Sequence, residues 1–143
     1  MTAYPGAGAV SAEERAAVEE LVARYNWAID TGDGRGVAAC FVEQGVFSGI
    51  SGRYEGHAEL AEFGARFAAA GREVAPLMHW VTNLVLARSP RGLRMRAYVM
   101  VVNAPEGAPR IHLWGHYDDQ LVQVGGAWRF ASRRFRPGTP ERL

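Results

Sequence analysis

The sequence predicts an α+β fold in which three N-terminal helices close a curved antiparallel sheet into a cone with one pocket, an α+β barrel. Two observations lead to this prediction. Apolar residues recur with helical spacing up to about residue 70, and four long runs rich in Val, Leu, Trp, Tyr and Phe follow them. Helices followed by hairpin-linked strands are typical of an antiparallel sheet that carries its helices on one face.

The first helix has a start signal, a stop signal and an apolar stripe. Ser11 with Glu14 three residues later fits a capping box, and Gly32 ends the helix. Between these ends, apolar residues repeat at helical spacing on one face. They are Val18, Leu21, Val22, Tyr25 and Ile29.

Two shorter helices and a short strand complete the first half. Asp33 caps a second helix, which has Cys40 on its inward face and ends at Gly45. A strand at Val46–Ile50 follows, and a third helix is predicted over His57–Ala70. Cys40 is the only cysteine of the chain, and we interpret it as a buried thiol that fills space rather than as a nucleophile or a metal ligand.

Four long strands are predicted for the second half of the chain. They cover His79–Ala87, Leu93–Asn103, Ile111–Val124 and Ala127–Phe135. Gly125-Gly126, between the last two, is typical of a two-residue hairpin turn.

The first of these strands has apolar residues on both faces. By alternation, one face carries Trp80, Leu84 and Leu86, and the other carries His79, Val81 and Val85. One face can line the pocket, whereas the other needs cover that three helices do not supply. We therefore expect a homodimer, with a trimer as the alternative.

Composition and charge narrow the classes of function. The 143 residues are predicted to form one domain, with an ordered core from about residue 11 to residue 136. All sixteen basic residues are arginines, which excludes a lysine Schiff base and a phosphate-loop lysine. A net charge of +1 does not favour nucleic acid as a partner, and no apolar run is long enough for a membrane span. Because its start does not match a signal peptide either, we expect a cytoplasmic protein.

A tyrosine, an aspartate and a histidine are the candidate catalytic residues. Tyr25 lies on the apolar stripe of the first helix, Asp30 in its last turn, and His79 at the head of an apolar strand. A carboxylate and a histidine that folding brings together can move a proton on a small molecule. Two plainer interpretations stay open, with Asp30 as a solvated turn residue and His79 as a satisfied core residue. Tyr25 and Asp30 are also about 140° apart around a helix, so they share a face only if the helix end unwinds.

Further polar residues are candidates for substrate binding. Alternation places Asn83 on the strand face of His79, and Asn103 ends the next strand. Tyr54 lies between Gly52 and Gly56, before the third helix.

A histidine pair and an arginine run occur on the last two strands. Alternation along a strand points three side chains the same way, those of His112, Trp114 and His116. They face either the pocket or a subunit partner. We take Trp114 and His116 as candidates for substrate binding. The two histidines are about 13 Å apart, which is too wide for one metal ion, so no metal site is predicted. We interpret Arg129–Arg136 as a salt-bridged surface edge of the last strand, with one arginine that enters the pocket to hold an anionic group as the alternative.

The pattern of these residues resembles the SnoaL-like branch of the nuclear transport factor 2-like superfamily. The motifs are Tyr25-x4-Asp30-x2-Asp33, Gly52-x3-Gly56, His79-x3-Asn83, Gly115-x-Tyr117-x-Asp119 and Gly126-x-Trp128-Arg129-Phe130. The resemblance extends from about Ser11 to Phe135. It implies a fold that hosts dehydratases, polyketide cyclases, ketosteroid isomerases, epoxide hydrolases and non-catalytic binding domains.

Within that superfamily, the placement of the tyrosine, aspartate and histidine is similar to scytalone dehydratase and to bile-acid 7α-dehydratase. By this resemblance, Asp30 holds and polarises His79, which abstracts a proton beside a carbonyl, while Tyr25 donates a hydrogen bond to the developing enolate. Asn103 stands where scytalone dehydratase has a further catalytic histidine, which argues against scytalone as the substrate.

The resemblance thus implies a cofactor-independent, dehydratase-like lyase or isomerase that acts on a hydrophobic, oxygenated ring compound of secondary metabolism. One alternative is a polyketide cyclase or epoxide hydrolase that uses the same pocket. The other is a non-catalytic domain that binds a small molecule.

Overall fold

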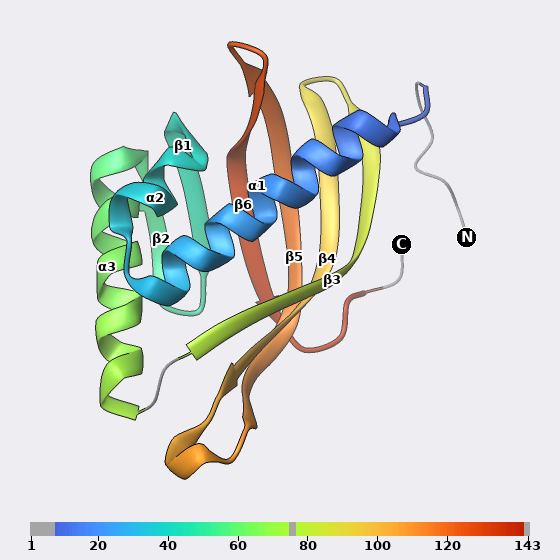
Figure 1. The fold of residues 1–143 in the computed structure, drawn as a ribbon. Coiled ribbons are helices and arrows are strands. Elements are labelled where there is room, and N and C mark those ends of the chain that lie inside the picture. Colours follow the sequence, from blue (N-terminus) through green and yellow to red (C-terminus); the bar gives the residue numbers. More distant parts are fainter. Residues whose placement is uncertain (1–7, 75–76, 142–143) are drawn as a thin grey trace.

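A curled sheet with helices packed against one face makes up the structure (Figure 1). The computed structural model describes residues 8–74 and 77–141, without the side chains of residues 68–74; residues 1–7, on which the signal-peptide prediction depends, lie outside this description. The described residues form three α-helices, a short 3-10 helix and six strands. In chain order these are α1 (Ala12–Thr31), α2 (Gly34–Ala39), β1 (Phe41–Gly49), β2 (Gly52–Glu55), α3 (Gly56–Val74), β3 (Leu77–Ser89), β4 (Gly92–Asn103), the 3-10 helix (Pro105–Gly107), β5 (Arg110–Val124) and β6 (Ala127–Pro137).

The sheet has the strand order β2-β1-β6-β5-β4-β3 and stays open. The predicted α+β class is confirmed, but the sheet does not close into a barrel. Its edge strands β2 and β3 do not pair with each other, and α3, which connects them, contacts both. The sheet is also mixed rather than wholly antiparallel, since β1 pairs with β6 in parallel. These two strands are far apart in the chain, so no hairpin constrains their relative direction.

The second helix ends earlier than predicted. It stops at Ala39 rather than at Gly45, and Phe41 already belongs to β1. Packing explains the difference, because the ring centroid of Phe41 lies 6.1 Å from that of Tyr25 and 5.3 Å from that of Phe130. The backbone N–H of Phe130 also donates to the carbonyl of Cys40 at 2.9 Å, which draws the chain into the sheet at this point.

Both predicted ends of α1 are confirmed. The Glu14 N–H donates to Ser11 Oγ at 3.1 Å, the Ser11 N–H donates to Glu14 Oε2 at 2.9 Å, and Gly32 ends the helix in the left-handed conformation at φ 74°. Glu14 also accepts two hydrogen bonds from Arg88, at 2.6 and 2.7 Å, which join the start of α1 to the end of β3. The Arg88 guanidinium lowers the pKa of the Glu14 carboxyl.

The core lies between α1 and the inward face of the sheet. The five stripe residues predicted for α1 are all buried. They face a regular alternation on β4, whose buried apolar residues are Leu93, Met95, Ala97, Val99 and Val101.

A buried ion pair lies in the middle of the sheet. Arg133 of β6 and Asp119 of β5 are 0% and 1% exposed, and the guanidinium donates to the carboxylate at 2.9, 3.1 and 3.3 Å. The guanidinium carbon also lies 3.9, 4.2 and 4.5 Å from the ring centroids of Tyr117, Phe130 and Tyr25. These cation–π contacts partly compensate for Nη1 of Arg133, which is buried and has no hydrogen-bond partner among the described residues.

The prediction of a surface edge for Arg129–Arg136 is therefore wrong for Arg133. Strand β6 is central because β1 pairs with its far side. In addition, the pairing of β5 with β6 skips Ala131, since Gln120 pairs with Ser132 and Leu121 with Phe130. One extra residue reverses the faces of the strand beyond it and turns Arg133 inward.

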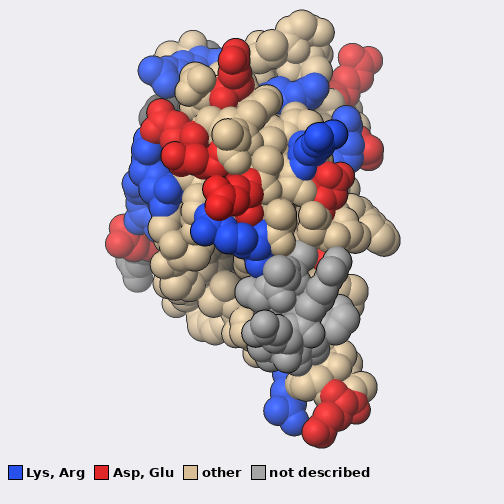
Figure 2. All heavy atoms as spheres, turned by 90° about the vertical axis from the view of Figure 1, so that its left-hand side faces the viewer, with Lys and Arg blue, Asp and Glu red and all other residues tan. Residues whose placement is uncertain are grey.

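The side of the molecule that carries α3 shows both signs of charge. Figure 2 shows Arg side chains interspersed with Asp and Glu over this side, without one large patch of either sign. This distribution agrees with the net charge of +1. In the described part of the chain, the helices are too short or too polar to cross a membrane.

We expect Asp119→Ala to lower the free energy of unfolding by about 3–5 kcal/mol, because it leaves the Arg133 guanidinium charged and buried without its partner. Burial raises the pKa of Asp119 to about 6 against the opposing effect of Arg133, so the pair is ionised at pH 7. Unfolding in guanidinium chloride, followed by circular dichroism, measures the change.

The matched control replaces both partners, Asp119→Leu with Arg133→Met, so that no unpaired charge remains in the core. This double variant should lose less stability than Asp119→Ala. A single variant as stable as the wild type would contradict the structural importance of the pair.

Candidate active site

The end of α1 and the start of β3 meet at a carboxylate–histidine contact. Asp30 and His79 are 49 positions apart, yet Nδ1 of His79 lies 2.6 Å from Oδ1 of Asp30. The backbone N–H of His79 donates to both carboxylate oxygens as well, at 3.2 and 3.0 Å. The side chain of His79 is 5% exposed and that of Asp30 is 17% exposed. Asp30 is therefore not a solvated turn residue.

This contact determines where His79 carries its proton. An ionised carboxylate can only accept hydrogen bonds, so Nδ1 is the donor and the neutral ring keeps its lone pair on Nε2. The ring of Phe67 packs against the imidazole with 5.2 Å between the centroids. A histidine with one nitrogen held by a carboxylate and the other directed at a substrate is suited to act as a general base.

His79 lines a cavity of about 290 Å³ between the helices and the sheet. The cavity wall is mainly apolar and includes Ile29, Phe47, Phe63, Phe67, Val99, Val101, Leu113 and Phe135. Its polar lining consists of Tyr25, Ser51, His79, His112 and Tyr117. A mainly apolar cavity with a few convergent polar groups is typical of a small-molecule site. Within the described residues, no group of three or more His, Cys, Asp or Glu side chains could hold a metal ion.

Tyr25 and Asp30 are related to His79 in different ways. Tyr25 lines the same cavity as His79, whereas Asp30 contacts His79 but does not line the cavity. Because α1 stays helical to Thr31, Tyr25 and Asp30 remain on different helix faces.

A second tyrosine joins the cavity wall. Tyr25 and Tyr117 are 1% and 2% exposed, and burial raises the pKa of Tyr25 well above its ordinary value and that of Tyr117 to about 12. Both hydroxyls therefore keep their protons at neutral pH and can donate hydrogen bonds to a substrate oxygen. Tyr117 is not among the residues predicted for the site. Alternation along β5 from the buried Asp119 would have placed it on the inward face.

Asn83, predicted to share a strand face with His79, lies elsewhere. It occupies a bulge of β3 with φ 57°, where the register between β3 and β4 shifts. The side chain lines a shallow hollow on the outer side of the sheet, so the predicted placement is wrong. The same bulge turns Leu84 and Leu86 towards the core, although alternation from Trp80 predicts that they face outward.

Trp114 and His116 also lie on the outer side of the sheet. Trp114 is 54% exposed and lines an outer hollow with Trp80. Nδ1 of His116 lies 3.3 Å from the carbonyl oxygen of Gly138, in the segment after β6. Neither residue lines the cavity with His79.

The last two predicted binding residues lie beside the cavity without lining it. Asn103 is buried on the inward face of β4, two residues beyond Val101. The Tyr54 ring stacks on Phe63 at 4.6 Å between centroids, and its hydroxyl donates to the Ser51 carbonyl at 3.1 Å. Tyr54 therefore supports the cavity wall from behind.

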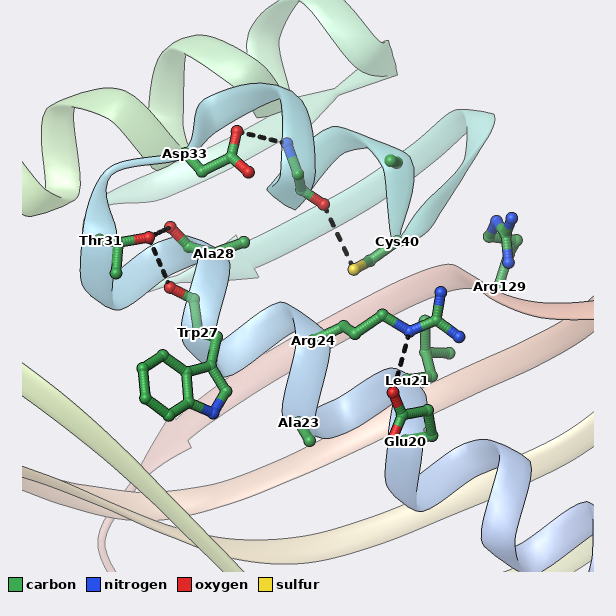
Figure 3. Close-up of a pocket in the computed structure, with 12 residues that line it drawn as sticks. Glu20, Leu21, Ala23, Arg24, Trp27, Ala28, Thr31, Asp33, Cys40 and Arg129 are labelled. Atoms are coloured by element: carbon green, nitrogen blue, oxygen red, sulfur yellow. Dashed lines mark hydrogen bonds and ion pairs between the residues drawn. The ribbon is translucent and has the colours of Figure 1, made fainter.

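A larger hollow of about 540 Å³ lies between α1, α2 and the start of β6 (Figure 3). Most of its polar groups already have partners, because Arg24 lies 3.6 Å from Glu20 and the Cys40 thiol donates to the Gly36 carbonyl at 3.3 Å. Asp33 accepts from the Gly36 N–H at 2.9 Å and caps α2, as predicted. None of the three candidate catalytic residues lines this hollow, so the candidate active site is the smaller cavity.

Comparison with known proteins assigns the chain to a family. Residues 10–134 match the SnoaL-like domain. The chain therefore belongs to the SnoaL-like family, as its motifs indicate. A search of curated proteins finds no match.

Similar solved structures share the fold. Aln2 from a Streptomyces species is 30% identical with a TM-score of 0.79, and the match covers 91% of this chain and 94% of that one. A variant of Rv3472 from Mycobacterium tuberculosis, a protein of unknown function, is 30% identical with a TM-score of 0.78, over 92% of this chain and 78% of that one. ActVI-ORFA from Streptomyces coelicolor is 22% identical with a TM-score of 0.77, over 86% and 96% of the two chains.

We expect neutral His79 to carry its proton on Nδ1, because that nitrogen donates to the Asp30 carboxylate. Long-range ¹H–¹⁵N NMR spectra of the histidine rings measure the tautomer directly. Asp30→Ala should remove this preference, while the spectrum of His57, which contacts the Phe41 carbonyl at 2.9 Å, should stay unchanged. A wild-type His79 that is protonated on Nε2 in its neutral form would contradict the arrangement.

Proposed function

We propose that this chain is a cofactor-independent, dehydratase-like lyase for a hydrophobic, oxygenated ring compound of secondary metabolism. The observation that carries the proposal is the contact between Asp30 and His79 at the wall of an apolar cavity. The carboxylate stabilises the imidazolium that forms when His79 accepts a proton, as an orienting acid does for a catalytic histidine. Membership of the SnoaL-like family is consistent with this chemistry.

The lining of the cavity points to the class of substrate. Its volume of about 290 Å³ accommodates one or two fused rings, and its apolar wall favours an uncharged molecule. The hydroxyls of Tyr25 and Tyr117 are suited to hold one carbonyl oxygen, so a ketone is the favoured acceptor. We therefore propose a cyclic β-hydroxy ketone as the substrate.

The proposed reaction begins at the carbon beside the carbonyl. Nε2 of His79 takes a proton from that carbon, and the negative charge moves to the carbonyl oxygen. Tyr25 and Tyr117 stabilise the developing oxyanion by hydrogen bonds in a site with little water. The enolate then expels the β-hydroxyl group, which leaves as water after it gains a proton. The products are an unsaturated ketone and water.

Two probes separate the steps of this reaction. 1-Tetralone has exchangeable protons beside its carbonyl but no leaving group, so deuterium uptake from D₂O reports proton abstraction alone. 3-Hydroxy-1-tetralone adds the β-hydroxyl, so loss of water from it reports the complete elimination. Both molecules are bicyclic ketones of a size that suits the cavity.

We expect His79→Ala and Asp30→Asn each to reduce deuterium uptake by 1-tetralone about 10²–10⁴-fold, the usual contribution of a general base. Asp30→Asn keeps the shape of the side chain but removes the charge that stabilises protonated His79. The double variant should lose little more than the worse single variant, because residues that act as a unit are not additive. Tyr25→Phe should cost less, since it removes one neutral donor and leaves the ring packed.

Thermal melting of every variant is the control for folding. Folded single variants that keep wild-type exchange would contradict the role of the dyad. A wild-type protein that binds 1-tetralone without exchanging its protons would favour a non-catalytic binding domain instead.

We further propose that the chain forms a homodimer through the outer face of its sheet. Large apolar side chains are exposed there on three neighbouring strands: Met78, Trp80, Tyr98, Ile111 and Trp114 are 50–62% exposed. Trp80 and Trp114 pair with Met100 from either side, so they form one row across β3, β4 and β5. A hollow of about 430 Å³ opens over this row. An apolar patch of this kind on a soluble domain marks an interaction surface.

We expect light scattering to give twice the monomer mass of 15.6 kDa for the wild type. Trp114→Glu should shift the protein to the monomer, because it places a charge in the apolar row. The matched control is Trp27→Glu, on α1, where the indole is 74% exposed and lies away from this face. A concentration-independent mass of 15.6 kDa for the wild type would contradict the dimer, and three times that mass would replace it by a trimer.

A further inference from the structure

An extra residue in β5 directs a second histidine into the cavity. Strand β5 pairs Ile111 with Val102 and Leu113 with Val101, so the ladder skips His112. Neighbouring side chains of a regular strand point to opposite faces, yet His112 and Leu113 both line the cavity. A bulge changes the direction of one side chain of a strand, and bulges are frequent beside active sites.

The two histidines of the cavity lining differ in their exposure to solvent. The side chain of His79 is 5% exposed and is therefore shielded. His112 is exposed, as are Ile50 and Ser51 of the β1–β2 turn, which also line the cavity. The cavity wall therefore contains one shielded histidine and one that solvent reaches.

Elimination of water involves two proton transfers. One removes the proton from carbon, and the other gives a proton to the hydroxyl that leaves, and each can have its own group. The contact with Asp30 suits His79 to the first transfer, because Nδ1 is bound to the carboxylate and only Nε2 is left for a substrate in the cavity that His79 lines. A separate donor for the second transfer has to come from the remaining lining.

The hydroxyl groups of the cavity lining can donate hydrogen bonds, but they are weak acids and do not readily transfer a proton. Burial raises the pKa of Tyr117 to about 12 and that of Tyr25 well above its ordinary value, and a serine hydroxyl such as that of Ser51 is a weaker acid still. A histidine side chain, by contrast, is the commonest general acid in enzymes. Its open position lets His112 recover a proton from solvent after each turnover.

We propose that His112 is a second catalytic residue, the general acid that protonates the leaving hydroxyl group; this inference depends on the proposed elimination. His79 gains the proton of the carbon, the C–O bond breaks, and the hydroxyl takes a proton from the His112 imidazolium and leaves as water. After the product and water leave the cavity, water that enters it takes the proton from His79, and His112 takes one up from solvent.

The two tetralone probes test whether His79 and His112 carry out different proton transfers. We expect His112→Gln to slow loss of water from 3-hydroxy-1-tetralone about 10²–10⁴-fold, while deuterium uptake by 1-tetralone stays within about twofold of the wild type. His79→Ala should lose both reactions. His116→Gln is the matched control, four residues along the same strand but on its outer side, and should keep both.

A second variant distinguishes an acid from a structural residue. Because His112 is exposed and the side chain of His79 is not, added imidazole should restore water loss to His112→Ala but not to His79→Ala. Wild-type rates of water loss in His112→Gln would overturn the acid role and leave the proposed function intact. Equal loss of exchange and elimination in His112→Gln, without rescue of His112→Ala, would also overturn it. A wild-type protein inactive in both assays would overturn the proposed function and this inference together.

Discussion

The side chains that reach the cavity depend on where the alternation of the sheet is interrupted. A strand presents its residues to two faces with a period of two, so one inserted residue changes the face of everything beyond it. The bulge at Asn83 removes that residue from the face of His79, and the bulge at Ala131 brings Arg133 into the core. The bulge at His112 lets two consecutive side chains enter the cavity. The curvature that wraps the sheet around its helices is thus also what selects the chemistry of the site.

The hydrogen bonds that hold the candidate base also attach β3 to α1. Asp30 accepts from the backbone N–H of His79 and from its ring, so one carboxylate fixes both the strand and the imidazole. Hydrogen bonds to an ionised acceptor are among the stronger ones in proteins. Asp30 lies at the C-terminal end of a helix, where the helix dipole does not favour negative charge, so the donors from β3 supply the favourable contacts that the helix end does not. Stability and function therefore share the same contact.

A second buried charge lies beneath the cavity. The guanidinium of Arg133 contacts the rings of Tyr25 and Tyr117, whose hydroxyl groups are the proposed oxyanion donors. Its positive charge opposes the rise that burial causes in the pKa of both tyrosines. The carboxylate of Asp119 compensates the charge of Arg133 and thereby lowers the free-energy cost of burying the guanidinium inside the sheet. The ion pair is thus part of the electrostatic environment of the site as well as of the core.

Local signals in the sequence were sufficient for the class of fold, the ends of α1, the cap of α2 and the candidate residues Tyr25, Asp30 and His79. Each of these depends on a periodicity or on residues a few positions apart, and such patterns act through local backbone geometry. Only the tertiary structure decided that β1 joins β6 in parallel, that the sheet stays open, and which strand residues face the cavity. The positions of Asn83, His112 and Arg133 follow from bulges, which relieve the strain of a curved sheet and leave no fixed mark in the local sequence. Contact between Asp30 and His79 likewise required the whole chain to fold, because 49 residues separate the two groups.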